Sequence, residues 1–276
     1  MDAGLAKRMR VACAVAVAAI GAATVALAPG AVAGPATLMP DLIALSTEQD
    51  QMIVTKEGGK TLLRLTTEIA NVGNGPLEVF PSATGSDCDA NGSATDDRDA
   101  YQRFFADTNG SGGYEPDADG VASERQFGCL HYHAAHGHWH LLDFAHYELR
   151  RDPGGRLVSR STKIGFCLVD DRNVFPGPFA PEHPHYPFGS ASSQVGCDEH
   201  ATQGISVGWA DAYAFSVPGQ SLDVTGLKRG HYCLISTTDP LDVLEESNES
   251  NNTRRVRLAL RPKRFSVRKL IGGCRE

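Results

Sequence analysis

The chain has 276 residues and a formal net charge of −7, with 33 Asp and Glu residues against 26 Lys and Arg residues. General nucleic-acid binding needs a basic surface, so this balance argues against it. The first 33 residues are typical of a secretory signal peptide: a basic start, an apolar run over 11–27 and Ala31-Val32-Ala33 as cleavage site. No other stretch is long enough to span a membrane, so we expect a secreted, extracellular protein without a membrane span after cleavage.

Removal of this segment would leave 243 residues, enough for one large β domain or two small ones. One acid and three bases would leave with it, which makes the net charge −9. Six cysteines would remain, and an even number in an exported chain indicates disulfide bonds. Among the possible pairs we favour Cys167–Cys197.

Short segments with alternating apolar and polar residues fill much of the chain and are typical of β-strands. Between 82 and 127 the composition shifts to Asp, Gly, Ser and Asn, which predicts a long acidic insertion loop. A second loop, rich in Pro and aromatic residues, is expected over 175–196 as a wall or lid of a site. The predicted strands lie at 41–45, 52–55, 61–68, 77–80, 144–149, 157–169, 211–217, 220–224, 231–237 and 254–260. We therefore predict a mainly β fold, an antiparallel β-sandwich with long irregular loops and little helix.

Six of the ten histidines lie in one stretch, at positions 131, 133, 136, 138, 140 and 146. His136, His138 and His140 alternate with other residues, and in a strand a period of two places alternate side chains on one face. Three imidazoles on one face suit Cu(II), Zn(II) or Ni(II) and leave a coordination position open for catalysis. A surface histidine tract, or imidazoles satisfied inside a core, is the alternative.

Five segments resemble the catalytic domain of lysyl oxidases in their order and spacing. They are HAAHGHWHLLDFAHYEL (133–149), KIGFCLVD (163–170), CDEHATQGISVGWADAY (197–213), GLKRGHYCL (226–234) and LEESNESNNTRRV (244–256). The resemblance implies a secreted, bacterial-type copper amine oxidase in which residues 34–276 form the catalytic domain. It implies that His136, His138 and His140 bind copper. It also implies that Lys163 and Tyr213 form the cofactor lysine tyrosylquinone.

The chemistry of these residue types agrees with that implication. A phenol near Cu(II) and O₂ is open to oxidation to a quinone, and a lysine amine adds to the ring only in its neutral form. The quinone then converts a primary amine to an aldehyde, with H₂O₂ and ammonia released. The α-proton needs a general base, and His146, six residues past His140 and in the same expected strand register, is one candidate. Asp143 is the other, unless it only orients a copper histidine.

The resemblance further implies a calcium site in the closing segment. Glu246, Asn248, Asn251 and Asn252 offer the hard oxygen ligands that calcium prefers, and Asp41 and the carbonyl of Leu42 would complete the set. Asn248 stands where the family commonly has Asp, which lowers the charge of the site. A polar hairpin turn is the alternative.

Other positions depart from the family. Ala135 and Trp209 stand where the family has cysteines, so its disulfide pattern does not transfer. His133 matches a family histidine, whereas His131 has no counterpart.

We therefore expect an amine oxidase that acts with O₂ on peptidyl lysine or small primary amines. A non-catalytic copper-binding or cell-wall-associated module and a metal-dependent hydrolase are the alternatives.

Overall fold

The structure is a computed structural model, and it describes residues 34–134, 137–163, 165–188 and 202–275. The predicted signal peptide, His136 and Cys197 lie outside these residues, and the Cys167–Cys197 pair therefore stays a prediction. Two disulfides join described residues, Cys88–Cys129 and Cys233–Cys274. Among the described residues, no helix has both the length and the apolar character needed to cross a bilayer.

The regular secondary structure of the described residues is almost wholly strand, with two short 3₁₀ helices, Gln49–Gln51 and Pro262–Arg264. The strands are β1 (Ala36–Leu38), β2 (Leu42–Ala44), β3 (Met52–Glu57), β4 (Lys60–Leu65), β5 (Thr67–Asn71), β6 (Leu77–Gly85), β7 (Asp97–Asp107), β8 (Gly120–His133), β9 (His138–Leu142), β10 (Ala145–Arg151), β11 (Leu157–Arg160), β12 (Gly165–Phe166), β13 (Arg172–Asn173), β14 (Gln203–Ile205), β15 (Trp209–Tyr213), β16 (Ser221–Asp223), β17 (Gly230–Thr238), β18 (Thr253–Arg261) and β19 (Ser266–Lys269). The prediction of a mainly β, antiparallel fold is confirmed.

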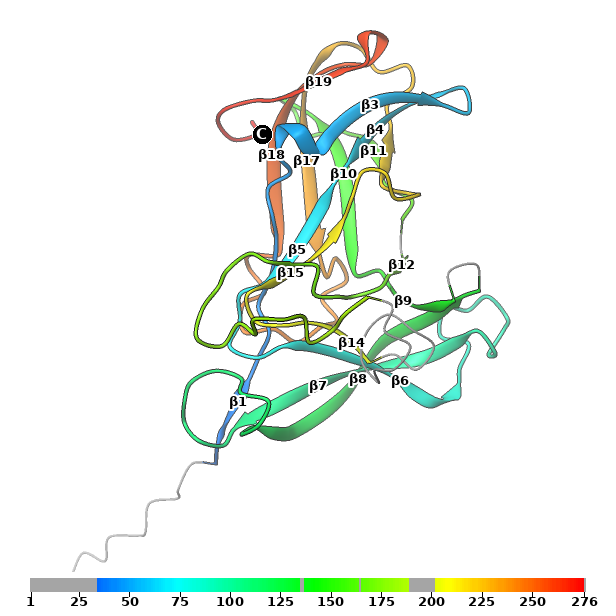
Figure 1. Ribbon diagram of the computed structural model, residues 1–276. Coiled ribbons are helices and arrows are strands. Elements are labelled where there is room, and N and C mark those ends of the chain that lie inside the picture. Colours follow the sequence, from blue (N-terminus) through cyan, green and yellow to red (C-terminus); the bar gives the residue numbers. More distant parts are fainter. Residues whose placement is uncertain (1–33, 135–136, 164, 189–201, 276) are drawn as a thin grey trace, which may run out of the picture. The chain divides into compact units, whose positions relative to one another are not determined.

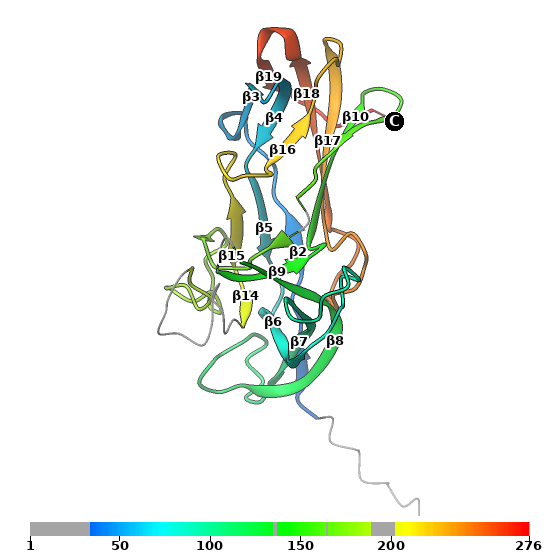
Figure 2. The same ribbon diagram turned by 90° about the vertical axis from the view of Figure 1, so that its right-hand side faces the viewer.

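Four sheets divide these strands (Figures 1 and 2). A seven-stranded sheet runs β12-β9-β8-β7-β6-β14, with β1 added beside β7. A five-stranded sheet runs β11-β10-β17-β18-β19. The smaller sheets run β13-β15-β5-β2 and β16-β4-β3. Two apolar clusters fill the interior, and the one that includes Leu141, Phe144 and Phe166 lies beside the predicted site residues.

The prediction of one long loop over 82–127 is wrong, because half of this segment forms β7, the start of β8 and the end of β6. Some of its charged residues lie on strands and pair across the sheet. Arg103, for example, binds Glu78 on β6 and Glu124 on β8, the latter at 2.9 Å. Phe104 and Phe105 are buried on β7. A composition that suggests a loop is here the polar face of a paired sheet.

The prediction that the histidine segment forms one strand is also wrong. β8 ends at His133, Gly137 has a positive φ of 73°, and β9 begins at His138. Asp143 has a φ of 56°, and the chain there leaves the seven-stranded sheet for β10 in the five-stranded sheet. His138 and His140 therefore share a strand, whereas His146 lies on another strand of another sheet.

Candidate functional site

A cavity of about 360 Å³ collects several of the residues that the sequence analysis selected. Their segments lie 23 or more residues apart in the chain and meet where β9, β12 and β15 approach one another. The lining residues are His138, His140, Lys163, Cys167, Val169, Asp171, Phe188, Asp211, Ala212, Tyr213, Val217 and Pro218.

The two histidines of β9 point their rings at each other. The Nε2 atoms of His138 and His140 are 3.0 Å apart. Two nitrogen ligands that each lie ~2.0–2.1 Å from one metal are about 3 Å apart when the N–metal–N angle is between its square-planar and tetrahedral values. The pair therefore fits a shared metal ion, and a histidine–histidine hydrogen bond is the alternative for this distance. His136, the third expected ligand, lies outside the described residues.

Neighbouring strands hold His140 in place. His133 on β8 pairs with His138 across the hairpin, and its ring centroid is 5.1 Å from that of His140. On the other side Gly165 of β12 touches His140 so closely that an added Cβ would lie 2.9 Å from its Nδ1. Glycine at 165 thus lets β12 pair with β9 without displacing the imidazole.

Lys163 and Tyr213 meet in the same cavity. The Lys163 ammonium nitrogen lies 4.7 Å from the centre of the Tyr213 ring and 4.9 Å from that of Phe166. Burial lowers the pKa of Lys163, and the negative charge of Asp211 partly opposes this effect. Burial of the amine thus favours the neutral form that the predicted cross-link needs.

Tyr213 is fixed through its hydroxyl. Its oxygen accepts a hydrogen bond from the Cys167 main-chain NH at 2.6 Å and donates one to the Cys167 carbonyl at 2.6 Å. The ring packs edge-on against Phe166, with centroids 5.2 Å apart. Burial, followed by the charge of Asp211, raises the pKa of Tyr213 well above its ordinary value. The phenol is therefore protonated and held rigidly beside Lys163.

Asp211 also belongs to this cavity, although the sequence pattern did not single it out. It lies two residues before Tyr213 on β15, so a period of two places both on one face of the strand. Asp211 is 2% exposed, and neither carboxylate oxygen has a hydrogen-bond partner of good geometry among the described residues. Burial raises its pKa well above the ordinary value, and the charge of Asp171 adds to the effect. The spacing from Tyr213 is the signal that would have found it.

The two predicted bases do not line this cavity. His146 on β10 pairs with Thr237 of β17 in the five-stranded sheet, so the expected register with the copper histidines is wrong. Asp143 is exposed in the turn between β9 and β10 and borders a different groove, which also contains Asp89 and Asp99. Their roles as bases remain predictions.

His131, which the sequence left unexplained, is part of a separate polar cluster. Its Nδ1 lies 2.8 Å from Oδ1 of Asp97 and 3.6 Å from Oδ2 of Asp89. Asp97 is fully buried, and burial raises its pKa while the hydrogen bond to His131 opposes that shift. His131 thus has a structural partner outside the cavity.

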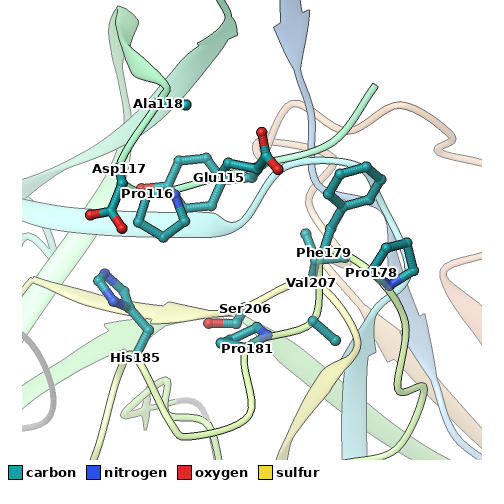
Figure 3. A pocket seen from close by; sticks show the side chains of 12 residues that line it. Glu115, Pro116, Asp117, Ala118, Pro178, Phe179, Pro181, His185, Ser206 and Val207 are labelled. Atoms are coloured by element: carbon teal, nitrogen blue, oxygen red, sulfur yellow. The ribbon is translucent and has the colours of Figure 1, made fainter. Parts of the chain in front are cut away.

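A second cavity, of about 390 Å³, lies between the segment around Glu115 and the predicted lid segment near Phe179 (Figure 3). His185 stands at one end and Phe179 at the other. None of the expected copper or quinone residues lines it. The lid residues near Phe179 therefore border this second cavity, whereas Phe188 of the same segment lines the first one and packs against His138 with ring centroids 5.9 Å apart.

The predicted calcium residues converge from both ends of the domain. Asn251 donates a hydrogen bond to Asp41 at 2.7 Å, and Glu246 accepts one from the Leu42 main-chain NH and one at 2.9 Å from Asn252. Burial raises the pKa of Glu246 to about 8. The side-chain oxygens of Asn251 and Asn252 are buried without a described partner. Unpaired buried oxygens beside a carboxylate fit a hard cation.

Asn248 does not join that set of contacts. Its side-chain oxygen accepts hydrogen bonds from the main-chain NH and the hydroxyl of Ser250, and the residue is exposed. The Leu42 main chain faces Glu246 through its NH, so the expected carbonyl contact has no support in these hydrogen bonds.

Comparison with known proteins identifies relatives of this chain. A family model described as lysyl oxidase matches residues 117–270. Protein-lysine 6-oxidase of Rattus norvegicus is 30% identical over 128 residues, which are 46% of this chain and 28% of that protein. The Gallus gallus protein of the same name is 32% identical over 44% of this chain and 26% of its own length. Lysyl oxidase homolog 3B of Danio rerio is 33% identical over 44% of this chain and 13% of its own length. The chain therefore spans less than a third of each of these relatives.

Proposed function

This chain belongs to the lysyl oxidase family, and from that premise we propose that it is a copper- and quinone-dependent amine oxidase. The observation that carries the proposal is the cavity in which Lys163 and Tyr213 lie side by side, together with His138 and His140. An ordinary surface lysine or core tyrosine would not be expected to lie beside the other and beside two histidines in one cavity.

Copper would be held by His136, His138 and His140, and His133 would support the position of His140. Lys163 and Tyr213 would supply the atoms of lysine tyrosylquinone. Together these groups supply a redox centre that accepts two electrons from an amine and passes them to O₂.

The residues of the chain prepare this centre in specific ways. The main chain of Cys167 fixes the Tyr213 hydroxyl, and the ring presents its face to Lys163. Burial depresses the pKa of Lys163, which makes its amine a nucleophile. His146 and Asp143 remain the sequence-based candidates for the general base.

The substrate would be a primary amine, either peptidyl lysine or a small amine, with O₂ as the second substrate. The name of the rat relative specifies a protein lysine. The negative net charge of this chain favours a cationic amine through electrostatic steering. Products would be the aldehyde, H₂O₂ and ammonia.

A calcium ion would bind at Asp41, Glu246, Asn251 and Asn252, with Leu42 and Asn248 as the remaining expected ligands. The unpaired oxygens of Asn251 and Asn252 support this part of the proposal. The ion would tie the segment before β18 to the start of β2.

The domain arrangement follows the same proposal. Residues 1–33 would be a cleaved secretory signal, and residues 34–276 one lysyl oxidase-like catalytic domain acting outside the cell. The two disulfides agree with an oxidising compartment.

One experiment tests the proposal directly. The mature chain is loaded with copper in air, and mass spectrometry of a digest shows whether a peptide containing Lys163 is joined to one containing Tyr213. We expect the linked peptide, and we expect phenylhydrazine to modify it. Two unlinked and unmodified peptides would overturn the proposal.

A further inference from the structure

Asp211 is a buried carboxylate that none of the roles described so far employs. It is 2% exposed, it lines the cavity beside Lys163 and Tyr213, and its oxygens have no hydrogen-bond partner of good geometry among the described residues. The nearby main-chain NH of Val169 offsets only part of the cost of burial. A buried charge without a partner is unfavourable, so this position indicates a cationic partner within the cavity.

Lys163 is the described cation that acts on Asp211. Its positive charge lowers the pKa of Asp211, and the charge of Asp211 in turn raises that of Lys163. The other charged groups acting on Asp211 are the carboxylates of Asp170 and Asp171, which repel it. The cross-link would consume Lys163 as a cation, and Asp211 would then face the cavity without its partner.

We propose that Asp211 is the catalytic residue that receives the ammonium group of the incoming substrate and takes one proton from it. This inference rests on the proposed function, because the substrate ammonium would replace the positive charge that Lys163 loses in the cross-link. A primary alkylamine has a pKa near that of lysine, about 10.4, and arrives protonated at neutral pH. One N–H bond of the ammonium breaks and one O–H bond forms on the carboxylate. The neutral amine keeps its lone pair for attack, and no oxidation state changes.

The test compares the wild-type chain with Asp211→Asn and Asp171→Asn. Asp171 lines the same cavity but is exposed, and its carboxylate already accepts a hydrogen bond from the Ala212 NH at 3.0 Å. All three chains are loaded with copper in air. Copper content, the mass of the Lys163–Tyr213 peptide, reaction with phenylhydrazine and thermal unfolding are then measured.

We expect Asp211→Asn to keep its copper and its cross-link, because removing the Asp211 charge makes the Lys163 amine more readily neutral. Phenylhydrazine is neutral at pH 7 and needs no deprotonation, so its reaction should also persist. The value of kcat/KM for n-butylamine should fall by about 100-fold at neutral pH, a loss typical of one proton-transfer group. That loss should shrink as the pH approaches the pKa of the amine. Asp171→Asn should lose far less activity than Asp211→Asn, because it removes only a charge that repels Asp211 and leaves the Asp211 carboxylate in place.

Unchanged kcat/KM in a folded Asp211→Asn protein would overturn the inference. Loss of copper or of the cross-link in that variant would overturn it too, since Asp211 would then serve the metal or cofactor formation. If Asp211→Asn does not fold, Asp211→Glu keeps the carboxylate and should retain reactivity toward n-butylamine.

A measurement on copper-free protein separates this inference from the proposed function. Acylation of Lys163 is followed by mass spectrometry over a range of pH. In Asp211→Asn the midpoint of that reaction should shift to lower pH, because the charge that raised the pKa of Lys163 is gone; Asp171→Asn should leave it unchanged. An unchanged midpoint in Asp211→Asn overturns the inference even if the wild-type chain forms no cross-link.

Discussion

The cavity around Asp211 and the turn around Glu246 both bury carboxylates, but they compensate them differently. Glu246 accepts hydrogen bonds from the Leu42 main chain and from the Asn252 amide, so the protein itself meets most of its needs. Asp211 has no hydrogen-bond partner of good geometry among the described residues, and the nearby Val169 NH offsets only part of the cost of its burial. A buried polar group left unpaired costs about 1–3 kcal/mol. The Glu246 carboxylate is therefore met largely by the protein itself, although the Asn251 and Asn252 oxygens beside it stay unpaired, whereas we propose that the Asp211 carboxylate meets a ligand.

The largest effect should follow removal of one hydroxyl from the cavity. Tyr213→Phe should abolish amine oxidation, a loss of at least about 1,000-fold, because no phenol is left to become a quinone. Copper content should be unchanged. Tyr147→Phe is the matched control, since Tyr147 is a fully buried tyrosine of the same apolar cluster but does not line the cavity. H₂O₂ release and metal analysis measure both. Oxidase activity in Tyr213→Phe would contradict the role of the cavity.

The histidines of β9 come next. His140→Ala should lose most of its bound copper, and with it the cross-link, because one of two facing imidazoles is gone. His183→Ala, on an exposed histidine of the 175–196 segment, should bind copper as wild type does. Metal analysis after dialysis makes the comparison. Equal copper content in the two variants would show that copper is bound elsewhere.

A smaller effect is expected for the base inferred from sequence. His146 lies on β10, outside the lining of the cavity, so His146→Gln should lower kcat by less than about tenfold. Loss of a true general base costs about 100- to 10,000-fold. Asp143→Asn tests the exposed carboxylate in the same way. A loss in the larger range for either variant would identify it as the base, as the family resemblance implied.

The sequence predicted what depends on local pattern. The alternation over 231–237 and 254–260 appears as β17 and β18. The family strings around Lys163 and Tyr213 selected two residues that line one cavity. The polar segment 82–127 was misread because the charges of β7 are paired across the sheet, and composition does not record pairing. The histidine stretch was misread because Gly137 and Asp143 take positive φ values that end a strand. Asp211 was missed because its surroundings depend on strands distant in sequence, such as β5, where it pairs with Ile69.

The smallest effect should be a shift in stability at the Glu246 turn. The pKa of Glu246 is about 8 in the folded chain, against an ordinary value of 4.5. Between these values the folded chain holds a proton that the unfolded chain has lost, so the stability of the metal-free protein falls as pH rises through this window. Calcium needs the carboxylate form, so its stabilising effect should grow over the same window. Saturation to 100 times Kd would contribute about 2.7 kcal/mol.

Thermal unfolding with and without calcium, below and above pH 8, measures this dependence. Glu246→Gln should remove the calcium response, because the ion loses the buried carboxylate that would hold it. Glu245→Gln is the control, because Glu245 is exposed and its carboxylate pairs with the surface Arg125, at 3.3 Å. An equal calcium response in both variants would mean that calcium does not bind through Glu246 and that the turn is held by its own hydrogen bonds. The contrast with Asp211 would then sharpen, since the cavity would be the one of these two regions that awaits a ligand.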